Sequence, residues 1–132
     1  MKDIWTEELA PVVSIDDSGS VRLAAHVTVT GFGGDLVHAS VRLAGELCAA
    51  TTPVVTGEVD RLLALGVRDV RFVLDDLRLC TSVGIDLWVE SAARVLPRGG
   101  DVRLVGASGV VRRALDAVGV DDSAVVRPHG RS

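Results

Sequence analysis

The hydrophobic residues of this chain change their spacing in a regular order, and that order restricts the fold more than any other feature. Residues 21–29 and 37–43 carry a hydrophobic side chain at every second position, the spacing of a strand with one buried face. A glycine-rich break, TGFGGD at residues 30–35, separates the two segments. Two such segments around a short break predict a β-hairpin.

After the hairpin, helical and strand spacings alternate. The expected elements are a helix at residues 51–66, a strand at 69–77, a helix at 82–96, a strand at 102–106 and a helix at 109–119. Thr52 and Ser108 stand where N-caps are expected, and Pro53 fits the first helical position. Residues 123–128 fit either a last short strand or simple packing. A strand, a helix and a strand within about 35 residues predict two parallel strands with a right-handed crossover.

These elements predict an α/β fold with one mixed β-sheet, in which the N-terminal hairpin is followed by parallel βαβ units and helices cover the sheet. A length of 132 residues suits one domain. We expect an N-terminal extension at residues 1–20, with a candidate short strand at 11–15, a domain at 21–127 and a tail at 128–132.

The charge and hydropathy of the chain exclude some partners. A net charge of -4 argues against nucleic acid, which usually needs a basic patch. No secretory signal opens the sequence, and no apolar run approaches the roughly 20 residues of a membrane helix. We therefore expect a cytoplasmic protein that contacts neither nucleic acid nor membrane, as a monomer or weak dimer.

The residues that usually hold metals or cofactors are scattered. Cys48 and Cys80 form no CxxC pair, and His26, His38 and His129 have no zinc-site spacing. The glycine-rich break is followed by a strand pattern, whereas a dinucleotide-binding loop is followed by a helix. We expect no metal and no cofactor.

Two adjacent carboxylates are the strongest sign of catalysis. Asp75 and Asp76 end a predicted strand, where catalytic or metal-binding carboxylates occur. The alternative is a solvated turn, which the lack of an evident third ligand favours; the pair could also steer a basic partner. No histidine lies in either crossover loop to activate a cysteine. The sequence therefore predicts a protein that is not an enzyme.

Four short segments carry a family resemblance. They are Gly45 to Cys48 (GELC), Ala50 to Pro53 (ATTP), Thr81 to Ile85 (TSVGI), and the helix from Val111 through Gly119. In this order and spacing they resemble the STAS domains, most closely the bacterial anti-sigma-factor antagonists, over about residues 21–127. No single segment is diagnostic.

The resemblance implies a protein that works by partner switching. Such antagonists bind an anti-sigma factor, usually a serine/threonine kinase of the GHKL type, and so free a sigma factor for transcription. The kinase then phosphorylates a serine before the glycine, and the complex dissociates. A phosphate would add nearly two negative charges to a contact surface at a helix N-terminus.

This chain departs from the family pattern at the phosphorylation site. The position of the phosphorylated serine is held by Val83, and two family aspartates are replaced by Thr81 and Cys48. Ser82 and Thr81 are the candidate substitutes as phosphoacceptors, or else they cap the helix. Val83 has two interpretations. The chain is an antagonist that is always competent to bind or is released by another signal, or it is a diverged STAS domain that binds nothing through this edge. The residues expected to bind the partner are Cys48, Ala50, Thr51, Thr52, Cys80, Thr81, Ser82, Val83, Gly84 and Asp86.

The two cysteines suggest a second form of control. Each follows one of two neighbouring strands, so both thiols should lie at the same end of the sheet. Cys48 and Cys80 are then either a redox switch, which needs Cα atoms within about 7 Å, or small inert apolar residues. Two other functions remain open: a STAS module that binds a small ligand or lipid, and a scaffold subunit of a larger signalling assembly.

Overall fold

The computed structural model describes residues 3–120 and Val126. The elements in chain order are β1 (Ile4–Glu8), β2 (Val12–Ile15), β3 (Val21–Phe32), β4 (Asp35–Leu47), α1 (Thr52–Ala64), β5 (Asp69–Cys80), α2 (Ser82–Val95), a 3-10 turn (Leu96–Arg98), β6 (Val102–Val105) and α3 (Gly109–Ala117).

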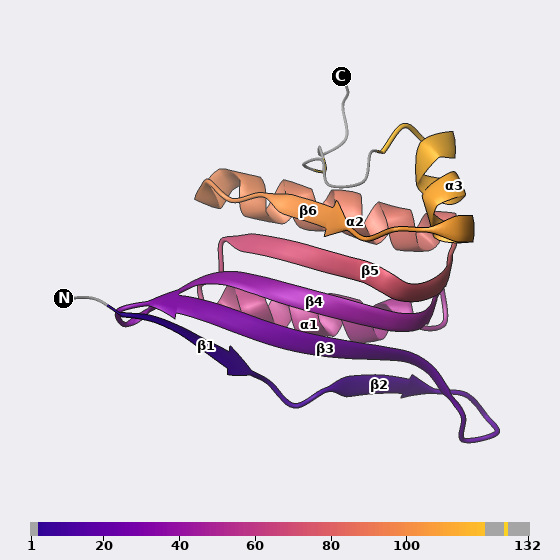
Figure 1. Ribbon diagram of the computed structural model, residues 1–132, viewed down its shortest axis with the longest axis horizontal. Coiled ribbons are helices and arrows are strands. Elements are labelled where there is room, and N and C mark those ends of the chain that lie inside the picture. Colours follow the sequence, from indigo (N-terminus) through magenta and orange to yellow (C-terminus); the bar gives the residue numbers. More distant parts are fainter. Residues whose placement is uncertain (1–2, 121–125, 127–132) are drawn as a thin grey trace.

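One mixed sheet organises the described chain (Figure 1). The strand order is β1-β3-β4-β5-β6, and β2 also pairs with β3. The hairpin β3–β4 is antiparallel, whereas β4–β5 and β5–β6 are parallel. The predicted fold class, a hairpin followed by parallel βαβ units, is confirmed.

The core lies between one face of the sheet and the helices α1 and α2, which run behind the sheet in Figure 1. Alternate residues of β3, β4, β5 and β6 point into it, such as Val41 in β4 and Phe72 in β5, both fully buried. Trp88 of α2 packs against Phe72, with ring centroids 6.1 Å apart. Each such aliphatic or aromatic side chain stabilises the fold by about 1.5–3 kcal/mol through removal from water.

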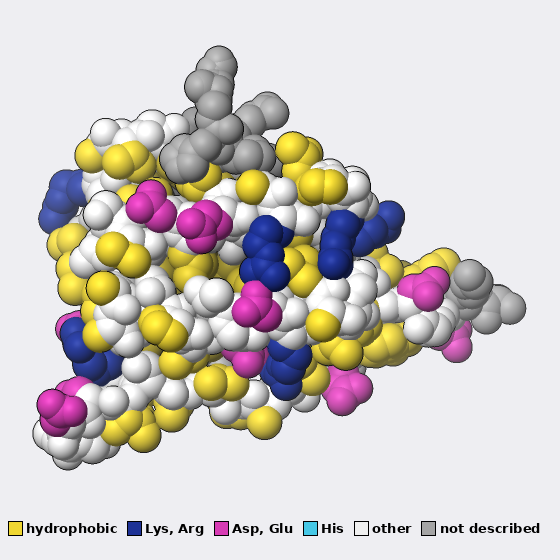
Figure 2. Space-filling model, turned by 180° about the vertical axis from the view of Figure 1, so that it is seen from behind, with side chains coloured by type: hydrophobic (Ala, Val, Ile, Leu, Met, Phe, Trp, Pro, Cys, Tyr) yellow, Lys and Arg dark blue, Asp and Glu magenta, His cyan; other side chains and the backbone are white. Residues whose placement is uncertain are grey.

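The outer side of the helix layer carries a mixture of charged, polar and hydrophobic side chains. Seen from behind, charged side chains of both signs are spread among hydrophobic ones (Figure 2). Arg94 of α2 reaches Asp60 of α1 with an N–O distance of 2.6 Å, an exposed ion pair that ties the two helices together. The helices therefore bury one stripe and present the other to water.

The opposite side of the sheet is not covered by α1 or α2, and we call it the open face. Its residues alternate with the buried ones, and include the exposed His26, Arg42, Arg71 and Arg103. The half-buried Ser40 lies among them. The open face therefore carries charged and polar side chains along its central strands.

Strand β5 (Asp69–Cys80) continues past its predicted end at residue 77, because two register shifts against β4 obscure the sequence pattern of its last residues. Arg42 pairs with Val73, but Ala44 pairs with Asp76, so β5 has one extra residue there. A second shift follows between the pairs of Gly45 and Glu46. Such bulges break the two-residue alternation that marks a strand in the sequence.

The ends of the elements differ from the predictions in several places. Strand β1 was not anticipated, while β2 lies within the candidate strand at residues 11–15. The N-cap of α1 is Thr51 and not Thr52, and the N-cap of α3 is Ser108, as expected, although neither side chain makes a cap hydrogen bond. Of the final strand proposed at 123–128, only Val126 is described, and its N–H donates to the Val102 carbonyl at 2.8 Å. The tail at 128–132 lies outside the described residues.

Among the helices that the structure describes, none combines the length and apolar character needed to cross a bilayer.

Candidate partner-binding surface

Two crossover loops meet at one end of the sheet. Strands β4 and β5 end side by side, because Leu47 pairs with Cys80 and the Thr81 N–H donates to the Leu47 carbonyl at 3.0 Å. The first loop leads into α1 and the second into α2, both on the right in Figure 1. We call residues 48–53 and 79–86 the crossover edge. All ten residues predicted to bind a partner lie within it.

The exposed part of the crossover edge is mainly apolar. Val83, the second residue of α2, is 42 % exposed, and Leu79 at the end of β5 is 36 % exposed. Ala49, Ala50 and Pro53 are exposed in the first loop. Asp86 is the charged residue of this edge and is also exposed. A mainly apolar surface with a single charged residue suits contact with another protein.

The start of α2 does not have the side-chain cap that the sequence suggested. Thr81 is the N-cap residue, but its side chain makes no cap hydrogen bond, and its Oγ1 is buried without a partner among the described residues. Ser82 is exposed and is the first residue of the helix. Thr81, one of the two candidate caps, is thus the N-cap residue, but it makes no side-chain cap hydrogen bond because its hydroxyl is turned into the protein.

Gly84 allows α2 to approach the sheet closely. A Cβ atom at this position would lie 2.8 Å from Leu47 side-chain atoms and 2.9 Å from the Cys80 Sγ. Any larger residue would push the start of α2 away from β4 and β5. Gly84 is buried against the sheet, and the close packing of α2 that it allows fixes the position of the neighbouring, exposed Val83.

The first loop is held together by buried threonines. Thr51 is fully buried, and its Oγ1 accepts a hydrogen bond from the Cys48 N–H at 3.0 Å and donates to the Glu46 carbonyl at 2.8 Å. Thr52 is 8 % exposed and donates to the Ala49 carbonyl at 3.3 Å. These two residues therefore support the surface from within.

The two cysteines are free and lie at the same end of the sheet, in different environments. Cys80 pairs with Leu47 and faces the core, and burial raises the pKa of its thiol to about 12. Cys48 lies one residue beyond Leu47, where its Sγ is 3.5 Å from Arg22 Nη2 on β3. The Sγ of Cys80 lies beside Gly84 and donates to the Thr81 carbonyl at 3.4 Å, whereas the Sγ of Cys48 lies beside Arg22 and Thr51. The two thiols therefore have different neighbours, and neither is in a disulfide.

The Cys48 thiol is polarised by its neighbours. Burial opposes its ionisation, but hydrogen bonds from the Ala50 N–H and from Thr51, together with the charge of Arg22, outweigh it and lower the pKa of the thiol. Arg22 also forms an ion pair with Glu46 at 3.2 Å. Sequence reasoning missed Arg22, although the hairpin pairing of Leu23 with Gly45 brings residues 22 and 46 together.

The carboxylates of Asp75 and Asp76 lie within β5, beside its first bulge, and not in the turn that the sequence suggested. Asp76 forms an ion pair with Arg42 at 3.6 Å. The Asp75 carboxylate lies against Gly106, where a Cβ would be 2.1 Å from its Oδ1. Across residues 3–120 and Val126, no three His, Cys, Asp or Glu side chains gather as a metal site would require.

Comparison with known proteins supports the resemblance. The sequence matches the STAS domain family over residues 29–131. The fold is similar to the unphosphorylated form of the anti-sigma factor antagonist SpoIIAA, with a TM-score of 0.59 and 18 % identity, covering 66 % of this chain and 80 % of that one. It is also similar to an anti-sigma factor antagonist from Mycobacterium paratuberculosis, with a TM-score of 0.57 and 16 % identity, covering 89 % and 79 % of the two chains. At these identities the structures establish a shared fold. No curated protein matches the sequence.

Proposed function

Since this chain belongs to the STAS domain family, we propose that it is an anti-sigma factor antagonist that binds its partner through the crossover edge. The observation that carries the proposal is the exposed, mainly apolar surface around Val83 at the start of α2, in which Asp86 is the one charged residue. Two solved structures of the same fold are anti-sigma factor antagonists. The role is binding in the cytoplasm, without catalysis or cofactor.

The proposed partner is an anti-sigma factor of the GHKL kinase type. Such a kinase would find no hydroxyl at Val83, so the usual negative charge could not be added there. The exposed part of Val83 would instead be buried in the complex, contributing roughly 1–2 kcal/mol. The antagonist would thus stay competent to bind while ATP is present.

The crossover edge offers a test with a closely matched control. Val83 and Val110 are each the second residue of a helix, and they are 42 % and 48 % exposed. An aspartate is equally compatible with either helix N-terminus. We expect Val83→Asp to abolish binding of a purified GHKL-type anti-sigma factor in calorimetry, and Val110→Asp to leave it unchanged.

The serine variant separates binding from phosphorylation. With the same kinase and ATP, Val83→Ser should incorporate phosphate and then release the partner, whereas the wild-type chain should remain bound. If Val83→Asp binds as tightly as wild type, the contact surface lies elsewhere. If no GHKL-type anti-sigma factor encoded with this protein binds the wild-type chain, the proposed function is wrong.

A further inference from the structure

A cavity lined mainly by polar and charged residues lies on the open face of the sheet, at the opposite end from the crossover edge. Its volume is about 330 Å³, and it lies over the starts of β5 and β6 and the adjoining part of β4. The residues that line it come from four neighbouring strands and the turn before β6. Its size is at the lower end of the range for small-molecule sites.

The strand register sorts the charges of this cavity into two rows. In the first row, His38 lies beside Asp69, with Nδ1 3.2 Å from Oδ2. The other carboxylate oxygen of Asp69 accepts the Asp101 N–H at 2.9 Å, which brings a second acidic residue alongside. In the second row, Ser40 pairs with Arg71, and Arg71 pairs with Arg103. The rows are two residues apart, or about 7 Å along the strands.

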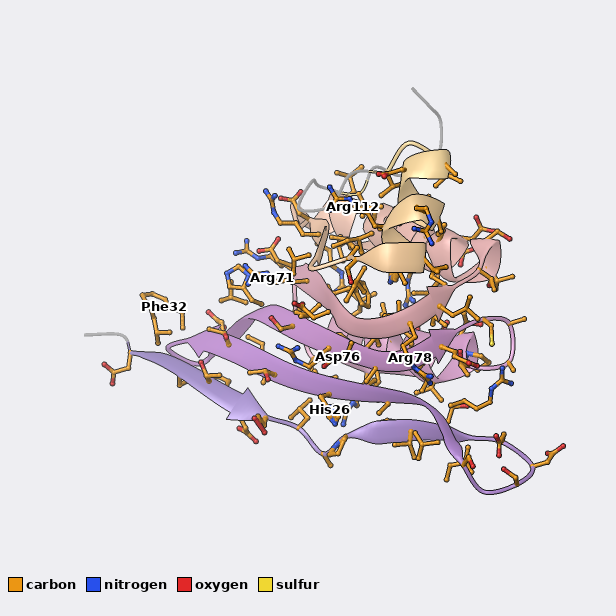
Figure 3. The ribbon with its side chains drawn as sticks, turned by 45° about the vertical axis from the view of Figure 1, so that its right-hand side comes forward. His26, Phe32, Arg71, Asp76, Arg78 and Arg112 are labelled. Carbon is orange, nitrogen blue, oxygen red and sulfur yellow. The ribbon has the colours of Figure 1, made fainter. Side chains whose placement is uncertain are left out.

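Arg71 is the central residue of the basic row. It is exposed and forms no ion pair with any residue that the structure describes. Figure 3 shows it near the start of β5, well apart from Asp76 and Arg78 further along the strand. It is directly opposite Arg103, so the two guanidinium groups start from neighbouring positions on the open face. A dianion between them would be attracted by both.

We propose that this cavity binds a sugar phosphate. The phosphate would lie between Arg71 and Arg103, whose planar guanidinium groups suit its oxygens, with the Ser40 hydroxyl beside it. The carboxylates of Asp69 and Asp101 would accept hydrogen bonds from the sugar hydroxyls. A carboxylate ligand would carry only one negative charge for two guanidiniums. A nucleic acid backbone would bring further phosphates against the acidic row.

The test uses ribose 5-phosphate, with inorganic phosphate and ribose as reference probes, added to the full chain and followed by amide NMR and calorimetry. We expect saturable binding of ribose 5-phosphate, with shifts confined to residues 38–40, 69–71 and 101–103. Arg71→Gln should weaken it by at least about tenfold, the equivalent of 1.4 kcal/mol. Arg113→Gln, which removes an exposed arginine of α3, should leave it unchanged.

The acidic row gives a second readout. Asp69→Asn keeps an oxygen that can accept the Asp101 N–H but removes the charge. This variant should weaken ribose 5-phosphate and leave inorganic phosphate equal or tighter. The proposal is overturned if ribose 5-phosphate produces no saturable shifts at millimolar concentration, or if Arg113→Gln weakens it as much as Arg71→Gln does. If Asp69→Asn changes the affinities for ribose 5-phosphate and for inorganic phosphate equally, the cavity is a simple anion site and the sugar is not recognised. None of these outcomes depends on the anti-sigma factor.

Discussion

Gly45 of β4 lies close to the backbone of β3, and its replacement by alanine should destabilise the fold severely. Its φ angle is +116°, and an added Cβ would lie 2.2 Å from the Arg22 carbonyl oxygen. The left-handed conformation costs an alanine about 1–2 kcal/mol. Overpacking adds about 1–3 kcal/mol, at the upper end here because the blocking atom belongs to the backbone. We expect a total loss of about 3–4 kcal/mol.

Two other glycines separate these contributions. Gly66 has a φ of +95° and open space where an alanine would place its methyl group, so Gly66→Ala should lose only the conformational part, about 1–2 kcal/mol. Gly57 lies inside α1, also with open space, and Gly57→Ala should stabilise the protein by about 0.5–1 kcal/mol. The three variants should therefore differ in both size and sign.

Urea unfolding and thermal melting followed by circular dichroism measure these changes. With an unfolding entropy of about 2.1 cal/mol/K per residue, each kcal/mol shifts the melting temperature of this chain by about 4 °C. Gly45→Ala should melt about 10–15 °C lower than wild type, and Gly66→Ala about 4–8 °C lower. Equal losses for Gly45→Ala and Gly66→Ala would refute the close approach of Gly45 to β3.

Two further predictions concern buried groups of the crossover edge. Thr51→Val should lower the free energy of unfolding in urea by about 1–3 kcal/mol, because it leaves the Cys48 N–H without its acceptor. Thr51→Ser keeps the hydroxyl and should cost less than about 1 kcal/mol. Equal losses for the two variants would contradict the hydrogen bonds described. The stability should also fall as the pH rises from about 9 to about 12, since the Cys80 thiol loses its proton near pH 9.0 when unfolded but only near pH 12 when folded. Below about pH 9 the Cys80 thiol is protonated in both the folded and the unfolded state, so it does not make the stability depend on pH. Cys80→Ala should make the stability fall less steeply over this pH range. The effect of Cys80 is easy to isolate because few other side chains titrate there: the chain has no tyrosine, and Lys2 is its only lysine.

The regular elements could be predicted because their buried faces follow a strict period. The stripe of Val55, Val59 and Leu62 is buried as expected for α1, and Val70 and Phe72 alternate into the core from β5. Strand β1 escaped prediction because its segment, IWTEE, has no buried face. It is held by pairing with β3 and by the indole of Trp5, whose Nε1 donates to the Gly33 carbonyl at 2.8 Å.

The location of the candidate site was also predictable, whereas its details were not. Parallel strands bring their carboxyl ends together, so the meeting of the two crossover loops follows from the βαβ pattern alone. The direction of each side chain depends on the bulges in β5 and on the hairpin register. For this reason the burial of Thr51, the different surroundings of Cys48 and Cys80, and the contact between Cys48 and Arg22 could be found only in the structure.

Strands β1 and β2 lie one after the other along β3, and neither continues into the other. Pro11, in the interval between them, has no amide hydrogen to offer, and Glu7 and Glu8 place charge on β1. A continuous outer strand would present a long template to the edge of another molecule. The interruption leaves two short runs of backbone along this edge, which disfavours the pairing of this edge with another molecule.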